Sequence, residues 1–520
     1  MLWCKPPRKW RCDFKKTFID HLNLNFNMNT KKTGAPEPHD ADAKLLESMG
    51  YQQDLHRRMS KFSNFAVSFS IICILAGGIT AFPSALGAAG GLSIGLGWIV
   101  GATFAVVVAL AMAQIASAYP TAGGLYHWGS ILGNKGYGWV TAWFNLLGLI
   151  FVIASVNFGV YDPFFKTLVA PLLGFDTNDW GWAQQTGFIA LFTITQAILN
   201  HKAVGLTTKL IDISGYLIFI IATVLVLALW MYSKTPIDVS RLFTFTNFTG
   251  QEGSMWPESS SSLMVFLSGL LLTIYTITGF DASAHTAEET HNAAENVPKG
   301  IVSSVLWSAL FGFGLVATFL LVIPDLAEGV KSGLGFFAAL LDSLPTGLKV
   351  ILGVGIFAVN YLCALAAMMS TSRMVYAFAR DGGLPASSAL KSVDSVTKAP
   401  VAAIWATAIS SFVATLYGDA FVVLSTACAV FMYISYIMPT AVGFFVEGKT
   451  WTKKGPFDLG GLSKPIALLA VMGGLVLIFV GIQPPNEKVL YAIIALVVFL
   501  AVFWWGFGER NRFKGPPNIK

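Results

Sequence analysis

The chain has 520 residues, of which 55% are hydrophobic and only 12% carry a charge, and its formal net charge at pH 7 is +6. So few charged residues cannot cover a water-soluble globule of this length, which excludes an ordinary soluble protein. The 5 cysteines include no CxxC pair, so neither a zinc site nor a disulfide framework is indicated. Basic residues are dispersed over many loops, a pattern that does not indicate nucleic-acid binding.

Residues 1–63 differ in kind from the rest, because they carry many basic residues and prolines without a sustained apolar run. We predict a cytosolic tail that is mostly disordered. It lacks an apolar core of signal-peptide length, so a cleaved targeting peptide is not expected. Met28 would serve as a translation start as well as Met1. A second cytosolic tail is predicted at 509–520.

From Asn64 onward, the apolar runs of about 20 residues that cross a bilayer recur between short polar loops. They predict an all-α integral membrane protein with about twelve spans and a transmembrane domain over 64–508. The spans are placed at 64–88, 93–118, 138–163, 184–201, 207–232, 261–290, 299–323, 346–378, 400–417, 419–446, 465–481 and 488–507.

The orientation follows from the basic residues, which favour cytoplasmic loops. With the N-terminus inside, the outward-facing loops hold only about six of the 34 basic residues. These six are Lys166, Lys234, Arg241, Lys331, Lys349 and Lys488. We therefore predict that both termini are cytoplasmic. The plasma membrane or an inner membrane is taken as the default location.

Two of the predicted spans are interrupted by residues that disfavour a continuous helix. The interruptions are Ala76, Gly77, Gly78, Ile79 and Thr80 in the first span and Thr278, Gly279, Phe280 and Asp281 in the sixth. Matched interruptions five spans apart predict an inverted repeat of five helices plus five, over 64–232 and 261–446, with extra helices at 465–507. Glycine pairs also allow close helix packing, and that interpretation of Gly77 and Gly78 stands beside helix unwinding.

Freed backbone groups at membrane depth are tolerated only beside a cavity or a buried partner, so the interruptions predict a binding site. Amides at the first interruption suit a carboxylate, and carbonyls around Gly279 suit an ammonium group, with Phe280 closing over the substrate. Asp281 adds an intramembrane carboxylate, which is usually functional; it is equally suited to cap the helix that follows. Asn145, in the third span, either bonds the substrate or packs helices.

These residues resemble a known family, the amino acid, polyamine and organocation (APC) transporters, and within it the amino acid and choline transporter branch that includes GABA permeases. The resemblance spans Glu47 to about Arg512. Its specific parts are Ser68 to Thr80, Gln114 to Gly133, Gly279 to Gly300 and Ser372 to Pro385. It implies the leucine-transporter fold, alternating access, and a substrate held by the unwound centres of the first and sixth helices, with its carboxylate at residues 77–79 and its amine at residues 278–281.

The sequence leaves the identity of the coupling ion open. Ser370 and Thr371, in the eighth span, would join helix-one carbonyls around a sodium ion, as in sodium-coupled members of the fold, or bond only within their own helix. Lys209 would take the place of that ion, as in proton-coupled members, or snorkel to the interface or pair with Asp212. We favour proton coupling or substrate exchange over sodium.

A cytoplasmic gate is predicted from Arg380 and Asp381, which read locally as a helix end and tight turn and which the resemblance assigns to the inner gate. Glu288 and Glu289 end the sixth span on the same side and are candidates to contact them. These features predict a secondary transporter of an amino acid or a GABA-like amine; a choline or polyamine transporter and a non-transporting sensor are the alternatives. Without an HExxH, GxSxG or phosphate-loop motif, an enzyme is not expected. Neither a cofactor nor a metal site is expected.

Overall fold

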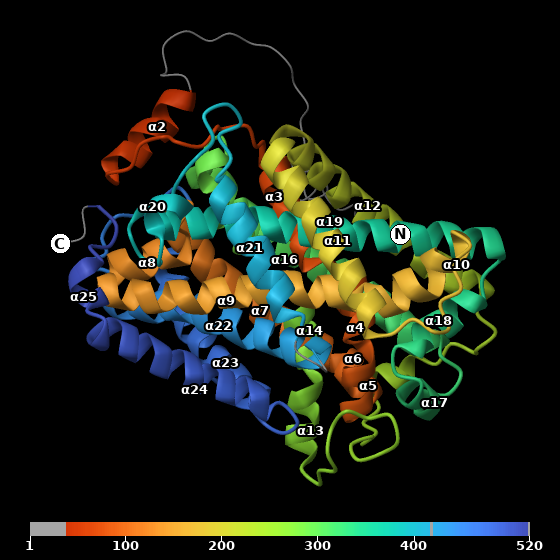
Figure 1. The fold of residues 1–520 in the computed structure, drawn as a ribbon. Helices are drawn as coiled ribbons and strands as arrows, with labels where there is room; N and C mark the ends of the chain where they lie inside the picture. Colours follow the sequence, from red (N-terminus) through yellow and green to blue (C-terminus); the bar gives the residue numbers. More distant parts are fainter. Residues whose placement is uncertain (1–37, 417–419, 518–520) are drawn as a thin grey trace, which may run out of the picture.

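The computed structural model describes residues 38–416 and 420–517, which form helices joined by loops. Nine of these helices are long and apolar enough to cross a membrane. A further helix of 21 residues, α11, and two shorter apolar stretches, Ser262–Thr276 and Val401–Ala414, complete the bundle. Most of the long helices run roughly along one direction (Figure 1). The predicted all-α membrane fold is confirmed.

Among the first six predicted spans, the structure divides the first, second, third and sixth into several pieces, whereas the fourth and fifth are single helices. Their elements are α3 (Lys61–Ile72), α4 (Ile74–Thr80) and α5 (Phe82–Ala89); α6 (Gly91–Ile94) and α7 (Leu96–Ala118); α9 (Lys135–Gly159), η1 (Tyr161–Val169) and α10 (Ala170–Leu172); α11 (Trp182–Lys202); α12 (Val204–Tyr232); and α13 (Ser262–Gly269), α14 (Leu271–Thr276), α15 (Ala282–His285) and η3 (Ala287–Glu289).

The last six spans are mostly single helices. They are α16 (Ala293–Val322), α19 (Thr346–Arg380), α21 (Val401–Ala414), α22 (Ala420–Val446), α23 (Ser463–Gly481), and α24 (Glu487–Ala501) with η5 (Val502–Gly506). The other elements are α2 (Pro38–Ser48), α8 (Leu125–Leu132), η2 (Val239–Phe243), α17 (Leu326–Lys331), α18 (Gly335–Asp342), α20 (Ser387–Leu390), η4 (Gly460–Leu462) and α25 (Glu509–Arg512).

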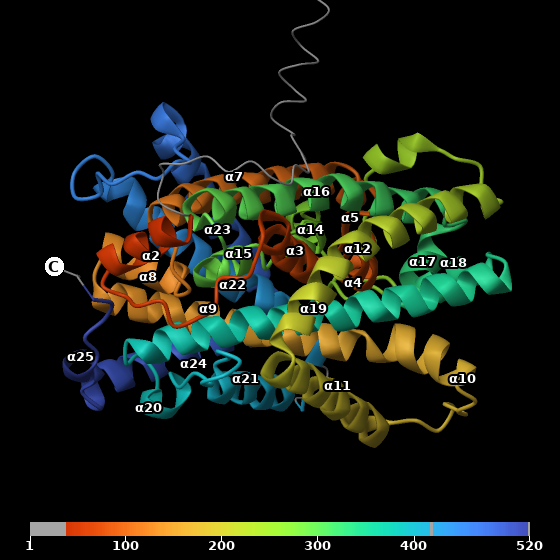
Figure 2. The same ribbon diagram turned by 90° about the horizontal axis from the view of Figure 1, so that it is seen from above.

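The two ends of the bundle differ in what covers them. In both views α2, α8, α20 and α25 gather at one end, whereas α10, α17 and α18 lie at the other (Figures 1 and 2). We call the first the tail-side end, because both chain termini of the described residues lie there, and the second the opposite end.

The described part of the N-terminal tail is ordered, in contrast to the disorder that we expected over 1–63. Residues 38–60, here called the strap, begin with α2 and continue along the tail-side end. Leu46, Met49, Leu55 and Met59 of the strap are buried, and burial of these scattered apolar residues repays the cost of ordering so short a segment. Both candidate start methionines lie outside the described residues.

The interrupted helices occupy the middle of the bundle. α3 begins at Lys61 because the Ser60 hydroxyl accepts a hydrogen bond from the Ser63 amide, 3.1 Å away, and so caps the helix. Around the interrupted helices, α9 packs against α22 and α19, and α16 packs against α7 and α3. Across the centre, α4 packs against α14, and α15 packs against α3.

Candidate functional site

The break in the first helix lies at Cys73, not at residues 76–80 as predicted from sequence. Cys73 has φ 26°, and Ala76 to Thr80 belong to the regular helix α4. Gly77 instead serves close packing, because a Cβ atom there would lie 2.8 Å from the Thr276 Cα atom of α14. Gly77 therefore packs closely against α14, and the unusual backbone lies four residues before it, at Cys73.

The break in the sixth helix spans residues 277–281, between α14 and α15, as predicted. Gly279 has φ +97°, a backbone conformation that favours glycine. A Cβ atom at this position would lie 2.4 Å from Ile71 Cγ2, so the chain of the sixth helix touches the last turn of α3. The two breaks therefore meet in the middle of the bundle.

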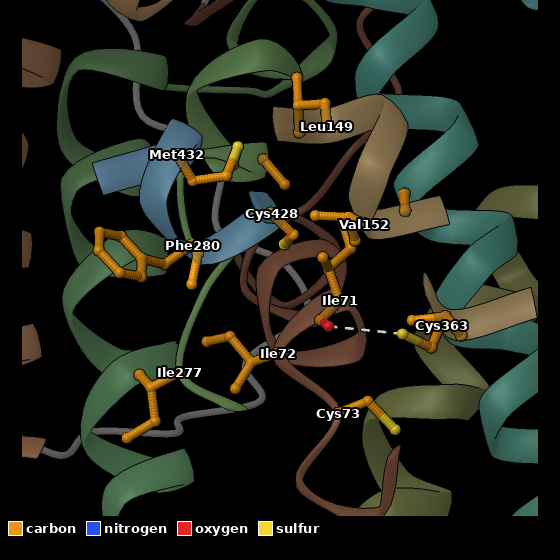
Figure 3. Packing of buried hydrophobic residues seen from close by; sticks show 14 of the residues in the cluster. Ile71, Ile72, Cys73, Leu149, Val152, Ile277, Phe280, Cys363, Cys428 and Met432 are labelled. Atoms are coloured by element: carbon orange, nitrogen blue, oxygen red, sulfur yellow. Dashed lines mark hydrogen bonds between the residues drawn. The ribbon is translucent and has the colours of Figure 1, made fainter. Parts of the chain in front are cut away.

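A small cavity of about 20 Å³ lies where the breaks meet. Its lining consists of Ile71, Ile72, Ala76, Gly77, Val152, Ser155, Val156, Tyr275, Thr278 and Cys428. Figure 3 shows Ile71, Ile72, Val152 and Cys428 converging beside the first break. The volume is roughly that of one water molecule, so the site is closed around its centre in this conformation.

A second cavity of about 200 Å³ adjoins the first, and Tyr275 lines both. Thr80, at the end of α4, and Pro83, at the start of α5, also line it. So do Trp256, from the loop before α13, and Leu334, from between α17 and α18. α17 and α18 lie at the opposite end (Figure 2). Because Leu334, between these two helices, lines the cavity, the cavity extends toward that end.

The structure divides the predicted substrate residues into two groups. Ala76, Gly77 and Thr278 line the central cavity, and Thr80 lines the larger one. Gly78 instead faces Leu315 and Val316 of α16. Ile79 and Phe280 are fully buried and line neither cavity.

Two carbonyl groups freed by the break in the sixth helix already have protein partners. The Tyr433 hydroxyl donates to the Ile277 carbonyl over 3.1 Å, and the Ser68 hydroxyl donates to the Phe280 carbonyl over 2.9 Å. In this conformation, side-chain hydroxyls therefore bind the two carbonyl groups that we predicted to hold an ammonium group.

The Asp281 carboxylate is fully buried and bound by side chains from several helices. Its Oδ1 accepts a hydrogen bond from the Tyr436 hydroxyl, 2.8 Å away. Its Oδ2 lies 2.9 Å from Asn145 Nδ2 and 3.2 Å from His285 Nε2. The side chain does not cap α15, so that alternative is wrong. Asn145 binds Asp281 directly, which joins two residues that were predicted separately.

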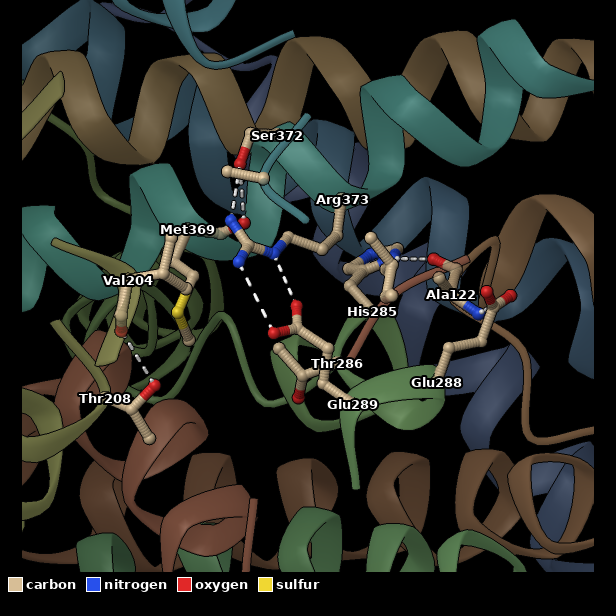
Figure 4. A network of polar contacts seen from close by, with 12 residues as sticks. Ala122, Val204, Thr208, His285, Thr286, Glu288, Glu289, Met369, Ser372 and Arg373 are labelled. Carbon is tan, nitrogen blue, oxygen red and sulfur yellow. Dashed lines mark hydrogen bonds and ion pairs between the residues drawn. The ribbon is translucent and has the colours of Figure 1, made fainter. Parts of the chain in front are cut away.

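A chain of contacts runs from Asp281 to the tail-side end. His285 Nδ1 lies 3.1 Å from the Ala122 carbonyl oxygen. The amide of the same residue, Ala122, donates to Glu288 Oε1 over 3.0 Å. Figure 4 shows His285 and Glu288 on either side of this backbone segment. Residue 122 therefore connects the polar cluster at the sixth-helix break to the glutamates that follow it.

The predicted gate residues form two buried ion pairs with α19. Glu288 binds Arg380 through two contacts of 3.1 Å each. Glu289 does not reach this pair; its Oε1 lies 2.6 Å from Arg373 Nε, two turns earlier on α19 (Figure 4). The sequence prediction placed both glutamates near Arg380, whereas η3 points them toward different turns of α19.

Asp381 is held by tyrosine hydroxyls rather than by the glutamates. Tyr51 of the strap donates to its Oδ2 over 2.7 Å, and Tyr126 of α8 over 2.9 Å. Burial raises the pKa of Asp381, while the charge of Arg380 and the two hydroxyl hydrogen bonds oppose that shift. The guanidinium carbon of Arg380 lies 3.9 Å from the centre of the Tyr51 ring, a cation–π contact.

The strap lies over this tail-side cluster, and most of its contacts there are with backbone groups of residues 287–293. Arg57 Nη1 donates to the Thr290 carbonyl over 2.6 Å. The Arg58 amide donates to the Glu289 carbonyl over 2.9 Å. Asp42 accepts from the amide of Asn292 over 2.7 Å. These contacts hold η3 and the start of α16, so the strap and the ion pairs close the same end.

The predicted coupling residues do not assemble into an ion site. Lys209 is exposed on α12, so its ammonium group does not fill the buried place expected for it. Asp212 instead accepts from Ser63 Oγ over 3.1 Å. The Thr371 hydroxyl donates to the Ala367 carbonyl within α19, and Ser370 Oγ is buried without a hydrogen bond to the described residues.

The residue of α19 that does meet a helix-one carbonyl is Cys363. Its Sγ lies 3.4 Å from the Ile71 carbonyl oxygen, at the end of α3 (Figure 3). A thiol is a soft ligand, whereas carbonyl, hydroxyl and carboxylate oxygens suit hard cations. The contact between the first and eighth spans is therefore a poor place for a sodium ion.

Sequence reasoning missed His285, Tyr436 and Tyr51. His285 follows Asp281 by one helical turn, and this membrane-embedded stretch also holds two glutamates. Such a density of ionisable groups in an apolar context was a usable signal. For Tyr436 and Tyr51 no local pattern exists, because their partners lie 155 and 330 residues away.

Comparison with known proteins agrees with this arrangement. A profile described as amino acid permease matches residues 59–506. The amino-acid permease BAT1 of Arabidopsis thaliana is 32% identical over 91% of this chain and 95% of its own length. The GABA-specific permease of Saccharomyces cerevisiae is 28% identical, over 90% of this chain and 84% of its own.

The resemblance found in the sequence is thereby confirmed, and so is the expectation of a transporter rather than an enzyme. Both of these relatives are named permeases, and the many apolar helices make the chain a multi-pass integral membrane protein. The chain belongs to the amino acid permease family of the amino acid, polyamine and organocation transporters.

Proposed function

We propose that this permease moves a neutral amino acid or a GABA-like amine across the membrane by alternating access. The observation that carries the proposal is the central cavity at the meeting point of the two helix breaks. That cavity is closed toward the tail-side end by buried ion pairs and adjoins a larger cavity toward the opposite end. A site between a closed side and a hollow side is what alternating access requires.

Ala76, Gly77 and Thr278 are the proposed substrate contacts among the predicted residues. Ala76 and Gly77 have almost no side chain, so a substrate can approach their backbone closely. Thr278 contributes a hydroxyl oxygen at the break in the sixth helix. The name of the yeast relative, a GABA-specific permease, supports an amine-bearing carboxylate as the substrate class.

We place the tail-side end in the cytoplasm of a plasma or inner membrane, with both termini inside. The distribution of basic residues supports this orientation. In it, the ion pairs of Glu288 and Glu289 with α19, together with Asp381 and the strap, form the inner gate. The structure is then the inward-closed state of the cycle, and these contacts separate when the substrate leaves.

For coupling, we propose protons or substrate exchange in preference to sodium. The contact of the Cys363 thiol with the helix-one carbonyl supports this choice, since it offers no hard ligand from α19.

Competition uptake tests the substrate class. Proteoliposomes with an inward proton gradient are given labelled GABA together with amino acids, choline or putrescine in turn, in sodium and in potassium buffer. We expect saturable uptake that amino acids inhibit and that survives replacement of sodium. Competition by choline or putrescine alone would favour the polyamine and choline alternative, and saturable binding without flux would favour a sensor.

Thr278→Val tests the site in the same assay. The change keeps the shape of a side chain that lines the cavity but removes its hydroxyl, which bonds the Ile274 carbonyl in this conformation. We expect the half-saturating concentration to rise about tenfold. Thr103→Val is the matched control, because Thr103 also bonds the carbonyl four residues before it but faces outward on α7. Equal effects of the two substitutions would exclude Thr278 from the substrate site.

Tyr51→Phe tests the role of the strap in closure. The substitution removes one of the two hydroxyl donors to Asp381, so the tail-side end should open more often. In a Cys4→Ser/Cys12→Ser background, the three remaining cysteines are buried. We expect faster labelling of these cysteines by a membrane-impermeant thiol reagent applied on the tail side. Tyr137→Phe is the control, because it removes a hydroxyl bond to the Met438 carbonyl and should leave the labelling rate unchanged. An unchanged labelling rate in Tyr51→Phe as well would argue against a closing role for the strap.

A further inference from the structure

We infer that Asp281 and His285 together hold the transported proton and that its presence locks the tail-side gate. The inference rests on the proposed transport function and names the site of its coupling ion. It places the proton neither at Lys209 nor among the hydroxyls of α19, but on a carboxylate–imidazole pair between the substrate site and the gate.

The hydrogen-bond partners determine how many protons this pair carries. The Ala122 carbonyl can only accept, so His285 Nδ1, 3.1 Å away, must carry a hydrogen. The Tyr436 hydroxyl oxygen accepts from the Gly279 amide over 3.1 Å and therefore gives its own hydrogen to Asp281 Oδ1. The one bond left to assign is the 3.2 Å contact between Asp281 Oδ2 and His285 Nε2.

That contact requires one further proton. If the proton lies on His285 Nε2, an imidazolium faces a carboxylate; if it lies on Asp281 Oδ2, a carboxylic acid faces a neutral imidazole. The pair is neutral overall in both forms, and every hydrogen bond is made. Without the proton, the Nε2 lone pair would face a carboxylate lone pair at 3.2 Å, and one negative charge would remain at a site with no solvent exposure.

Among the residues that the structure describes, the surroundings do not supply a substitute positive charge. From α22 the pair is faced by the Tyr436 hydroxyl and the Cys428 thiol, and from α9 by the Asn145 amide. The segment before α8 contributes backbone only, and α3 contributes no charged group to the contacts of α15. The nearby cations of α19 are already paired within the described residues, Arg373 with Glu289 and Arg380 with Glu288. Loss of the proton is therefore expected to break the contact between Asp281 and His285.

The contact lies on the route from the substrate site to the gate. On one side, Tyr436 joins Asp281 to the Gly279 amide in the break of the sixth helix. On the other side, His285 holds the Ala122 carbonyl, and the Ala122 amide holds Glu288, the partner of Arg380 (Figure 4). A displaced His285 ring would remove one of the two bonds that position this backbone segment against the gate.

The consequence is a proton that travels with the substrate. It binds while the central site communicates with the opposite end, keeps the tail-side gate closed during loading, and leaves when the gate separates. One proton is taken up on one side and released on the other in each cycle, and it enters no covalent chemistry.

Two fluxes measured on the same proteoliposomes test the inference. Substrate-driven proton entry is followed with a pH dye trapped inside, and counterflow is followed as the exchange of labelled outside substrate for unlabelled inside substrate. Asp281→Asn is the lead variant, because its amide can donate to Nε2 of a neutral imidazole without an exchangeable proton. The network is kept if the Asn145 amide turns its Oδ1, which has no hydrogen-bond partner among the described residues, toward the new donor. We expect proton entry to fall to background while counterflow persists and becomes independent of pH between pH 5 and 8.

Further variants keep the test decisive if one of the substituted proteins misfolds. Asp281→Glu keeps a carboxyl group and should retain proton entry, whereas His285→Gln should lose it. His201→Gln changes a histidine of α11 that accepts from Trp405 and should keep the proton-to-substrate ratio of the native protein. If Asp281→Asn does not fold and gives no counterflow, His285→Gln provides the test. If that variant does not fold either, the test is the pH dependence of counterflow by the native protein, because the inference requires such a dependence.

The outcomes separate the inference from the proposed function. Proton entry at the native ratio in Asp281→Asn or His285→Gln would show that Asp281 and His285 do not hold the transported proton. Counterflow and uptake by the native protein without any proton entry, or native counterflow that ignores pH, would overturn it too while leaving the permease function intact. A native protein that transports no member of the substrate panel would overturn both.

Discussion

Replacing Arg373 by alanine is expected to lower the free energy of unfolding by about 3–5 kcal/mol, because it leaves the buried carboxylate of Glu289 without its counter-ion. Both side chains are almost fully enclosed, at 1% and 3% exposure. Denaturant unfolding of the purified protein in detergent micelles measures the change. Transport should fall as well, because the pair joins η3 to α19 at the tail-side end.

Lys299→Ala is the matched control. Lys299 also forms an ion pair, with Glu295, but at 50% and 56% exposure. An exposed pair contributes about 0–1 kcal/mol. A double-mutant cycle with Glu289→Ala separates the pair from other effects, and the double variant should be less destabilised than the sum of the single changes. A loss in Arg373→Ala no larger than in Lys299→Ala would mean that the Glu289 carboxylate is not buried as described.

The second large effect is expected from Gly279→Ala, which should abolish transport and strongly destabilise the fold. Alanine at φ +97° is strained, at a cost of about 1–3 kcal/mol. The added methyl group would also lie 2.4 Å from Ile71 Cγ2, and overpacking of this kind costs about 1–3 kcal/mol more. Uptake and thermal unfolding of the same preparation measure both consequences.

Gly78→Ala provides the contrast. A Cβ atom at residue 78 would make an ordinary contact, 3.6 Å from Leu315, and alanine in a helix interior gains about 0.5–1 kcal/mol over glycine. We therefore expect unchanged or slightly raised stability and retained uptake. If instead Gly78→Ala abolishes transport and Gly279→Ala does not, the first helix is broken at the glycine pair after all.

This contrast also shows why one break was correctly located from the sequence and the other was not. Gly279 stands two residues before an intramembrane aspartate, so its local pattern coincides with the observed break. At the first break the unusual backbone falls on Cys73, a residue without a turn signal, while the conspicuous Gly77 is used for contact with α14. A glycine needed for close packing and a glycine needed for φ > 0 look the same in a sequence.

What the sequence alone establishes is the outline of the protein. Apolar runs of bilayer length, interrupted in the first and sixth spans, specify a membrane bundle with a central site, because the lipid core forces the backbone to satisfy its own hydrogen bonds. Local motifs were also sufficient to recognise the transporter family, and to single out Asp281, Arg380 and Glu288 as residues of interest.

Only the tertiary structure decides which of these residues act on one another. Asp281 meets Asn145 and Tyr436 across 136 and 155 residues of chain, and Glu289 selects Arg373 rather than Arg380 because η3 turns the two glutamates toward different turns of α19. Lys209, for which the sequence left both the ion site and the membrane interface open, is exposed because the helix phase of α12 directs it outward. Partners that are distant in sequence are set by helix phase and packing, and neither leaves a local pattern to be read.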